Sequence, residues 1–183
     1  FNSTEIGTLF GAGSPQLPVP MTKIDGARVL WLNERAARLD PAFAALGSSF
    51  EAYERSLLDM CAFRVARDEA KPADCIAYAD RYGGVGISRN GGSGRAVTLG
   101  GYHVKGIGRT PLVSTLADPA HASGGAYLEE CAREAIWAEI VQAEFPHGAV
   151  PVLAILDTGG HVVWETNKGP KSEQKCLLVR PSF

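Results

Sequence analysis

The sequence lacks long apolar runs, a strong excess of one charge and paired-cysteine motifs. No stretch reaches the ~18 to 20 apolar residues of a membrane-spanning helix, so we expect no membrane partner. The 18 basic and 20 acidic residues give a formal net charge of −2, which argues against a nucleic-acid partner. The four cysteines show no C-x-x-C spacing, which predicts reduced, mostly structural thiols in a cytoplasmic protein.

Histidine is scarce too, whereas hydrophobic residues are plentiful. None of the four histidines has a partner at metal-ligand spacing, so the sequence predicts no zinc site. Hydrophobic residues make up 45% of the 183, which is enough to bury a sizeable core. We expect an N-terminal arm with helices over residues 1–70, followed by a second part over residues 71–183 that holds the functional site.

Prolines and apolar spacing organise the first part. The run Gln16-Leu17-Pro18-Val19-Pro20 predicts an extended arm, and residues 27–32 are typical of a strand. Asn33 is a suitable N-cap for a short helix through Leu39. From Pro41 to about Arg67, apolar residues recur at spacings of three, four and seven, which predicts amphipathic helices.

A hairpin is the clearest local pattern of the second part. Residues 95–99 and 102–105 have strand character and are separated only by Gly100-Gly101, which predicts a tight turn with positive φ. Side chains alternate across a strand, so His103 and Lys105 would share one face of this hairpin.

A long helix and a second hairpin follow. Residues 126–145 predict the helix, with an apolar face that comprises Leu128, Cys131, Ala132, Ala135, Ile136 and Ile140. The run Asp157-Thr158-Gly159-Gly160 predicts a hairpin turn between strands at 150–156 and 161–165. Short connections favour antiparallel pairing. The sequence therefore predicts an α+β fold with an antiparallel sheet of about five strands and one long packed helix.

A glycine-rich loop lies directly before the first predicted hairpin. Gly91 to Gly94 allow the backbone to approach phosphate oxygens and to turn its N–H groups toward them. Lys105, on the second strand of the hairpin, adds a compact positive charge. The loop does not match the Walker pattern, because no Gly-Lys-Ser/Thr follows at the required spacing. Glu134 lies on a largely apolar stripe of the long helix, so we expect it to face a partner inside the fold.

The order of glycine loop, strand lysine, helix glutamate and second hairpin is that of the N-terminal lobe of protein-kinase-like folds. Two runs, Gly92-Ser93-Gly94-Arg95-Ala96 and Lys105-Gly106-Ile107-Gly108-Arg109-Thr110-Pro111, resemble signatures of the selenoprotein O family of pseudokinases. Arg133-Glu134, with Glu139, is similar to the helix signature of that family. The Pro-rich run at 16–20 and the final residues 179–183 also resemble family segments, so the likeness spans nearly the whole chain.

The resemblance implies which residues contact nucleotide. The implied set is Gly92, Gly94, Arg95, Lys105, Ser123, Gly124, Glu134 and Arg180. Within it, Lys105 would hold phosphate and Glu134 would be its partner, and we expect the two to form an ion pair because each is costly to bury alone. Two serines, Ser93 and Ser123, stand where the family has aspartates, so they can donate to phosphate but lack the charge.

The resemblance also implies an activity. Members of the family resemble kinases in fold but transfer AMP from ATP to protein hydroxyl groups, so ATP, magnesium and a protein substrate are implied. The catalytic base and the metal ligands would lie in a carboxy-terminal lobe, which we expect outside these 183 residues, so no catalytic residue or metal ligand is expected here. Two alternatives stay open. One is a kinase-like phosphotransferase, and the other is a non-catalytic pseudokinase, which the two serines favour.

Overall fold

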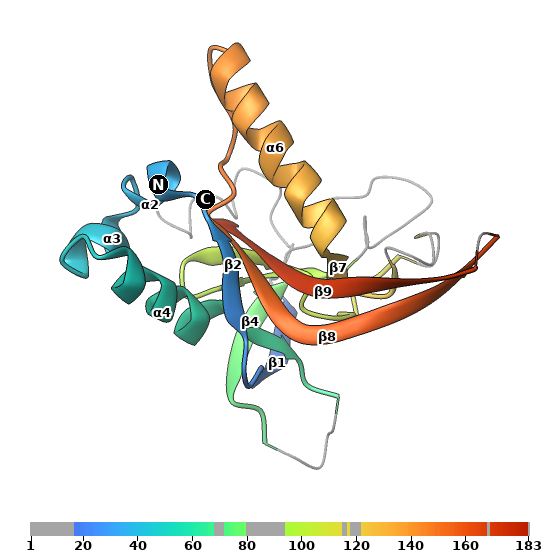
Figure 1. The fold of residues 1–183 in the computed structure, drawn as a ribbon. Coiled ribbons are helices and arrows are strands. Elements are labelled where there is room, and N and C mark those ends of the chain that lie inside the picture. The colour runs from blue at the N-terminus through green and yellow to red at the C-terminus, as the bar shows by residue number, and fades with distance from the viewer. Residues whose placement is uncertain are drawn as a thin grey trace, which may run out of the picture.

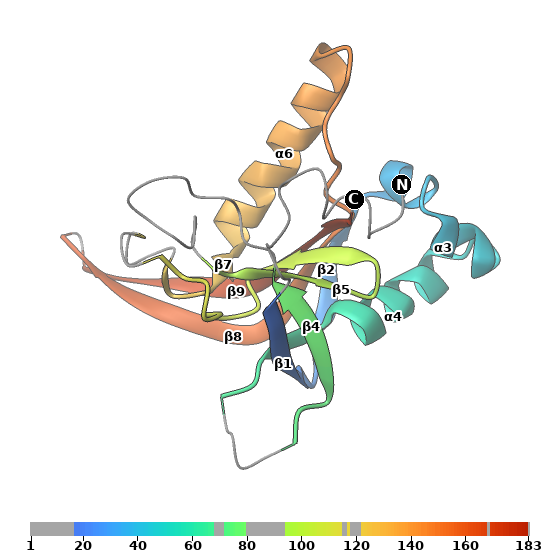
Figure 2. The ribbon, with the colours of Figure 1, turned by 180° about the vertical axis from the view of Figure 1, so that it is seen from behind.

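The computed structural model describes residues 17–67, 72–79, 94–114, 117, 122–167 and 169–182. It has a mixed α+β fold built on an antiparallel sheet, as the sequence predicted, and this sheet is curled (Figure 1, Figure 2). The helices are α2 (Glu34–Ala37), α3 (Pro41–Ala45), α4 (Phe50–Cys61) and α6 (Leu128–Glu144). The strands are β1 (Leu17–Lys23), β2 (Arg28–Leu32), β3 (Phe63–Val65), β4 (Cys75–Ala79), β5 (Ala96–Leu99), β6 (Tyr102–Lys105), β7 (Ala126–Tyr127), β8 (Ala154–Thr166) and β9 (Gly169–Pro181).

The sheet is wider than predicted, with nine strands in the described residues in place of about five. Its order is β2-β8-β9-β6-β5-β4-β1-β3, with β7 paired to β9, and every pairing is antiparallel. Some of the additional strands are very short: β3 has three residues and β7 has two. Runs of this length carry too few residues for alternation to be visible in the sequence. Strands from both sides of residue 70 belong to this sheet.

Strand β1 lies where the sequence predicted a Pro-rich arm. Pro18 and Pro20 are exposed, whereas Val19 and Met21 are buried, so the segment has the period-two alternation of a strand. Among the described residues, 17–20 form ladder pairs only with β4, and β3 joins the other edge from Met21 onward. On that edge the carbonyl of Pro20 accepts from the N–H of Ala66 over 2.9 Å. Proline is tolerated there because no backbone N–H has to be donated from its position.

The N-terminal helices begin at side-chain caps. Asn33 accepts from the backbone N–H of Ala36 at the start of α2, which confirms the predicted cap. Asp40 caps α3 and Ser49 caps α4 in the same way. The prediction of helix as far as Arg67 was wrong, because α4 ends at Cys61 and residues 63–65 form β3.

The hairpin at Gly100-Gly101 is confirmed. Leu99 pairs with Tyr102, and both glycines have positive φ, 59° and 87°. Tyr102 and Val104 are buried on one face, and Lys105 lies on the other, half-buried. The hairpin therefore carries Lys105 into the centre of the sheet, where β6 lies between β5 and β9.

The predicted turn at Asp157–Gly160 was wrong. Strand β8 continues through this segment, and pairing shifts from Asp157 with Cys176 to His161 with Gln174, four residues along β8 against two along β9. The extra residues form a bulge in which Gly159 has a φ of 72° and donates to the Asp157 carboxylate over 2.8 Å. The hairpin closes further on, where Thr166 pairs with Gly169.

The sheet is covered on both faces. One face packs on a large cluster that includes Met21, Phe43, Tyr53, Leu57 and Cys61, with α3 and α4. On that face Asp40 accepts hydrogen bonds from the hydroxyls of Tyr53, over 2.7 Å, and Tyr102, over 2.9 Å. The other face packs on α6 through a smaller cluster of mostly small side chains: Ala126, Cys131, Ala135, Ala138, Val152, Ile155, Cys176 and Leu178.

Helix α6 differs from the prediction in its start and in its buried side. Ala126 and Tyr127 pair with β9 as strand β7, so the helix begins at Leu128. It buries Cys131, Ala135 and Ala138, whereas Ile136 and Ile140, both expected on the packed face, are exposed. The small side chains allow the helix to approach the sheet closely, and its C-terminal half stands away from it (Figure 1). In the part of the chain that is described, no helix is long and apolar enough to cross a membrane.

Candidate functional site

Lys105 and Glu134 meet between β6 and α6. The Lys105 ammonium forms an ion pair with the Glu134 carboxylate, as the sequence predicted, and contacts Glu130 Oε1 over 2.9 Å. On the strand, Lys105 lies opposite Leu178 of β9, a residue of the α6-side cluster, so its side chain points toward the helix. The ammonium is therefore held by two carboxylates that are one helical turn apart.

Arg95, directly before β5, forms the buried end of the same cluster. Its guanidinium binds Glu130 in a two-pronged contact of 2.6 and 3.0 Å and also donates to the carbonyl of Gly125 over 2.8 Å. The Arg95 side chain is only 6% exposed. Burial raises the pKa of the Glu130 carboxyl, but hydrogen bonds from Arg95 and Lys105 outweigh that effect and hold the pKa below its ordinary value.

Arg180 forms the open end of the cluster. It lies on β9 opposite His103, donates to Glu134 Oε2 over 3.2 Å and to the carbonyl of Val150 over 3.3 Å. The exposed fraction of the side chain rises from 6% at Arg95 through 19% at Lys105 to 24% at Arg180 and 29% at Glu134. An anion from solvent would therefore meet Lys105, Glu134 and Arg180 first.

The glycines of the predicted site are held by close backbone contacts. Gly94 has a φ of 57°, and a Cβ there would lie 2.4 Å from the backbone nitrogen of Val113. Gly124 has a φ of 81°, and a Cβ there would lie 2.1 Å from the nitrogen of Arg109. Both positions thus require glycine for packing as well as for backbone conformation. Gly92 and Ser93 lie outside the described residues.

Ser123 lies beside the cluster, because its loop is hydrogen-bonded to Arg95. Its hydroxyl lies 3.0 Å from the Tyr127 hydroxyl and accepts from the N–H of Gly125 over 3.2 Å. Because Gly125 also accepts from Arg95, the segment 123–125 is tied to the charged residues. The structure thus brings Arg95, Lys105, Glu134 and Arg180 into one cluster and places Gly94, Ser123 and Gly124 at its border.

Glu130 is the member of the cluster that sequence reasoning missed. It contacts both Arg95 and Lys105, so it joins the buried and the open parts of the cluster. The sequence did contain a signal for Glu130: it precedes Glu134 by four residues and therefore lies on the same side of the helix. We name Arg95, Lys105, Glu130, Glu134 and Arg180 the charged cluster. Its three cations and two carboxylates leave one net positive charge, which suits an incoming anion.

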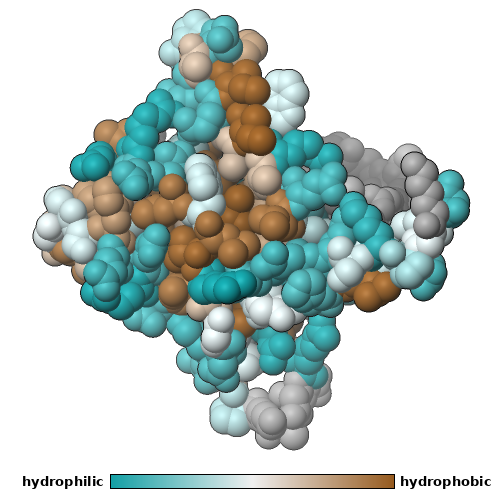
Figure 3. All heavy atoms as spheres, in the orientation of Figure 1, coloured by the Kyte–Doolittle hydropathy of each residue, from teal (hydrophilic) through white to brown (hydrophobic). Residues whose placement is uncertain are grey.

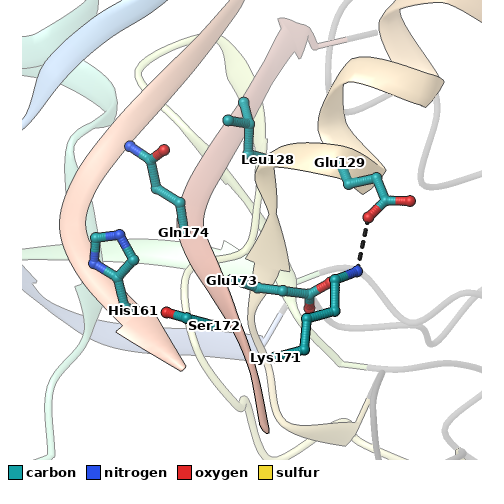
Figure 4. A pocket seen from close by; sticks show the side chains of 7 residues that line it. All are labelled: Leu128, Glu129, His161, Lys171, Ser172, Glu173 and Gln174. Carbon is teal, nitrogen blue, oxygen red and sulfur yellow. Dashed lines mark hydrogen bonds and ion pairs between the residues drawn. The ribbon is translucent and has the colours of Figure 1, made fainter. Parts of the chain in front are cut away.

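A separate pocket of about 510 Å³ lies on the β8–β9 hairpin beside the first turn of α6. The residues that line it are Leu128, Glu129, His161, Lys171, Ser172, Glu173 and Gln174. Figure 4 shows these side chains and the hydrogen bond from Lys171 to Glu129. None of the predicted nucleotide residues that the structure describes lines this pocket. Lys171 reaches Glu129 over 2.9 Å and Glu173 over 2.8 Å, so this lysine also has two carboxylate partners.

The described residues contain no group of three or more His, Cys, Asp or Glu side chains that could hold a metal ion. Comparison with known proteins gives this chain no family: no protein-family model matches it, and no curated protein matches it. Assignment of a function therefore depends on the motifs of the chain and on the geometry of the charged cluster.

Proposed function

We propose that this chain is the ATP-binding, kinase-like N-terminal lobe of a protein adenylyltransferase similar to selenoprotein O. The observation that carries the proposal is the ion pair between Lys105 on a central strand and Glu134 on the long helix. Two residues 29 positions apart, each singled out by a different sequence motif, meet in space. A merely structural salt bridge would give no reason for both to lie in motifs that resemble one nucleotide-binding family.

In this proposal the charged cluster holds the phosphates of ATP. Lys105, oriented by Glu134, would donate to a phosphate oxygen, and Arg180 would add a second positive charge at the open end. Arg95 already has a carboxylate partner, so it would reach phosphate only if Glu130 released it. Magnesium would neutralise further phosphate charge, with its ligands and the catalytic base supplied by a further lobe.

Nucleotide binding is the first test, because it needs only the 183-residue chain. Calorimetric titration with ATP should give saturable binding, and Lys105→Ala should weaken it by about tenfold or more, because a charge-assisted contact is lost. Lys171→Ala is the matched control, since Lys171 also contacts two carboxylates but lies outside the cluster. Equal ATP affinity in the Lys105→Ala and Lys171→Ala chains would contradict the proposal.

Activity is the second test and needs a longer protein that includes the proposed catalytic lobe. With magnesium and α-labelled ATP, label should appear on protein, and Lys105→Ala should remove on the order of a hundredfold of the rate. Label that appears only from γ-labelled ATP would establish a phosphotransferase. The 183-residue chain alone should transfer neither label, and turnover by it would overturn the assignment.

A non-catalytic pseudokinase is the second candidate. It is favoured by Ser123, a hydroxyl where the family has an aspartate, and this hydroxyl lies against Tyr127 over 3.0 Å. In that case ATP would bind with the same dependence on Lys105, and the longer protein would transfer neither label. The two tests together therefore separate the candidates.

A further inference from the structure

Helix α6 is apolar on two opposite sides. The side toward the sheet carries the small residues Cys131, Ala135 and Ala138, which are buried. The outer side carries large residues: Ile136 is 60% exposed, Trp137 is 59% exposed and Ile140 is 41% exposed. Figure 3 shows apolar atoms along this helix where it stands away from the sheet. A helix that is apolar on both sides is normally buried on both, so the outer side fits a protein surface.

The two ends of this outer side carry opposite charges. Residues turn by about 100° per position along an α-helix, so Arg133 and Glu144, 11 positions apart, lie on the same side as Ile136, Trp137 and Ile140. Both are exposed, and within the described ranges neither forms an ion pair. Their separation along the axis is about 16 Å, so they do not contact each other within one helix. We name Arg133, Ile136, Trp137, Ile140 and Glu144 the outer stripe.

We propose that the outer stripe binds the outer stripe of a second copy of this chain, with the two α6 helices antiparallel. A two-fold axis that passes between positions 138 and 139 places Arg133 opposite the partner's Glu144, and Glu144 opposite the partner's Arg133. The same axis places Trp137 against the partner's Ile140. Both charges and apolar side chains therefore match in one register, which is the self-complementarity that a two-fold interface needs.

The size of the stripe sets the strength of the dimer. One helix against another buries less than a standard interface, so association belongs to the weak, reversible class. Trp137 and the two isoleucines would form the water-free centre, which is where most of the binding energy of such an interface lies. The arginine and glutamate would lie at the rim, where they select the register and contribute little to affinity.

Sedimentation equilibrium of the 183-residue chain, over a concentration series up to several hundred micromolar, tests the proposal. We expect a reversible monomer–dimer equilibrium. Ile140→Glu should remove it, because a charge would be placed in the apolar centre of the interface. Val163→Glu is the matched control, because Val163 is 61% exposed on β8 and lies outside the stripe, so this variant should dimerise like the parent. Unchanged thermal unfolding midpoints at low concentration would show that both variants fold.

A charge swap tests the register. Arg133→Glu alone and Glu144→Arg alone each place like charges opposite one another twice per dimer, so each should weaken association on the order of tenfold. An equimolar mixture of the two variants should associate as strongly as the parent, because in the heterodimer every facing pair is again opposite in charge.

Three results would overturn the proposal. One is a parent that stays monomeric over the whole series, as expected if a different protein covers the stripe. The second is a dimer that Ile140→Glu leaves intact. The third is a mixture of the two charge variants that associates no better than either variant alone.

Discussion

The two faces of the sheet are packed in different ways. Under α3 and α4 the core is built from large side chains, such as Phe43 and Leu57, and Asp40 joins two tyrosine hydroxyls within it. Under α6 the core is built mostly from alanines and cysteines, and the charged cluster lies beside them. Large side chains give the first face most of its hydrophobic stabilisation, whereas small ones bring α6 close enough for its glutamates to reach β6. The side chains that contribute most to stability and the charged cluster thus lie on opposite faces of the sheet.

A cavity in the first face should have the largest effect. Leu57 is 0% exposed, and Leu57→Ala should lower the free energy of unfolding by about 2 to 5 kcal/mol in a denaturant titration. Leu39→Ala removes the same atoms from a side chain that is 82% exposed, and it should stay within about 0.5 kcal/mol of the parent. Equal effects at the two positions would mean that α4 does not anchor this face.

Removal of a carboxylate from the second face should come next. Glu130→Ala removes the two-pronged carboxylate contact of the buried Arg95 guanidinium, so we expect the free energy of unfolding to fall by about 3 kcal/mol. Its neighbour Glu129 pairs with Lys171 in solvent, with side chains 73% and 53% exposed, so Glu129→Ala should have a much smaller effect on the free energy of unfolding. The comparison fails if the two adjacent glutamates prove equivalent in denaturant titrations.

Acid should weaken the α6 face first. The pKa of Glu130 is held below its ordinary value of 4.5 in the folded chain, so its contribution is complete above that value and is lost as pH falls through the lowered pKa. Parent and Glu130→Gln should therefore differ in stability at neutral pH and converge in acid. Unfolding titrations from pH 7 to about pH 3 measure this, and a constant difference over the range would contradict the prediction.

Alkali should instead weaken the face under α3 and α4, with a smaller effect. Burial, followed by the hydrogen bond to Asp40, raises the pKa of Tyr53 and of Tyr102 above the ordinary 10.0. Because the folded pKa is raised, this stability is complete below pH 10.0 and is lost as pH rises above it. Tyr53→Phe should reduce the alkaline loss, which unfolding titrations of the parent and the variant above neutral pH would measure; an equal loss in both chains would contradict the prediction.

The sequence predicted local geometry better than long-range placement. The hairpin at Gly100-Gly101 was correct because it depends on a motif of a few residues. The pairing of Lys105 with Glu134, 29 positions apart, was also correct, but it was predicted from the family resemblance and from the cost of burying either charge alone. The segment Asp157–Gly160 was misassigned because its composition indicates positive φ but does not say whether the chain reverses or only bulges. For α6, periodicity showed apolar positions on the helix but could not tell which of two apolar sides packs on the sheet.

The buried thiols allow the opening of each face of the sheet to be measured separately. Burial raises the pKa of Cys61, Cys131 and Cys176 to about 12 each, so almost no thiolate is present at neutral pH while the faces are closed. Cys61 is the last residue of α4, Cys131 lies on the buried side of α6, and Cys176 lies on β9 in the same cluster as Cys131. An alkylating reagent can therefore modify each thiol only when its own face opens. Mass-spectrometric labelling rates at these cysteines would report the opening of the two faces independently in one sample.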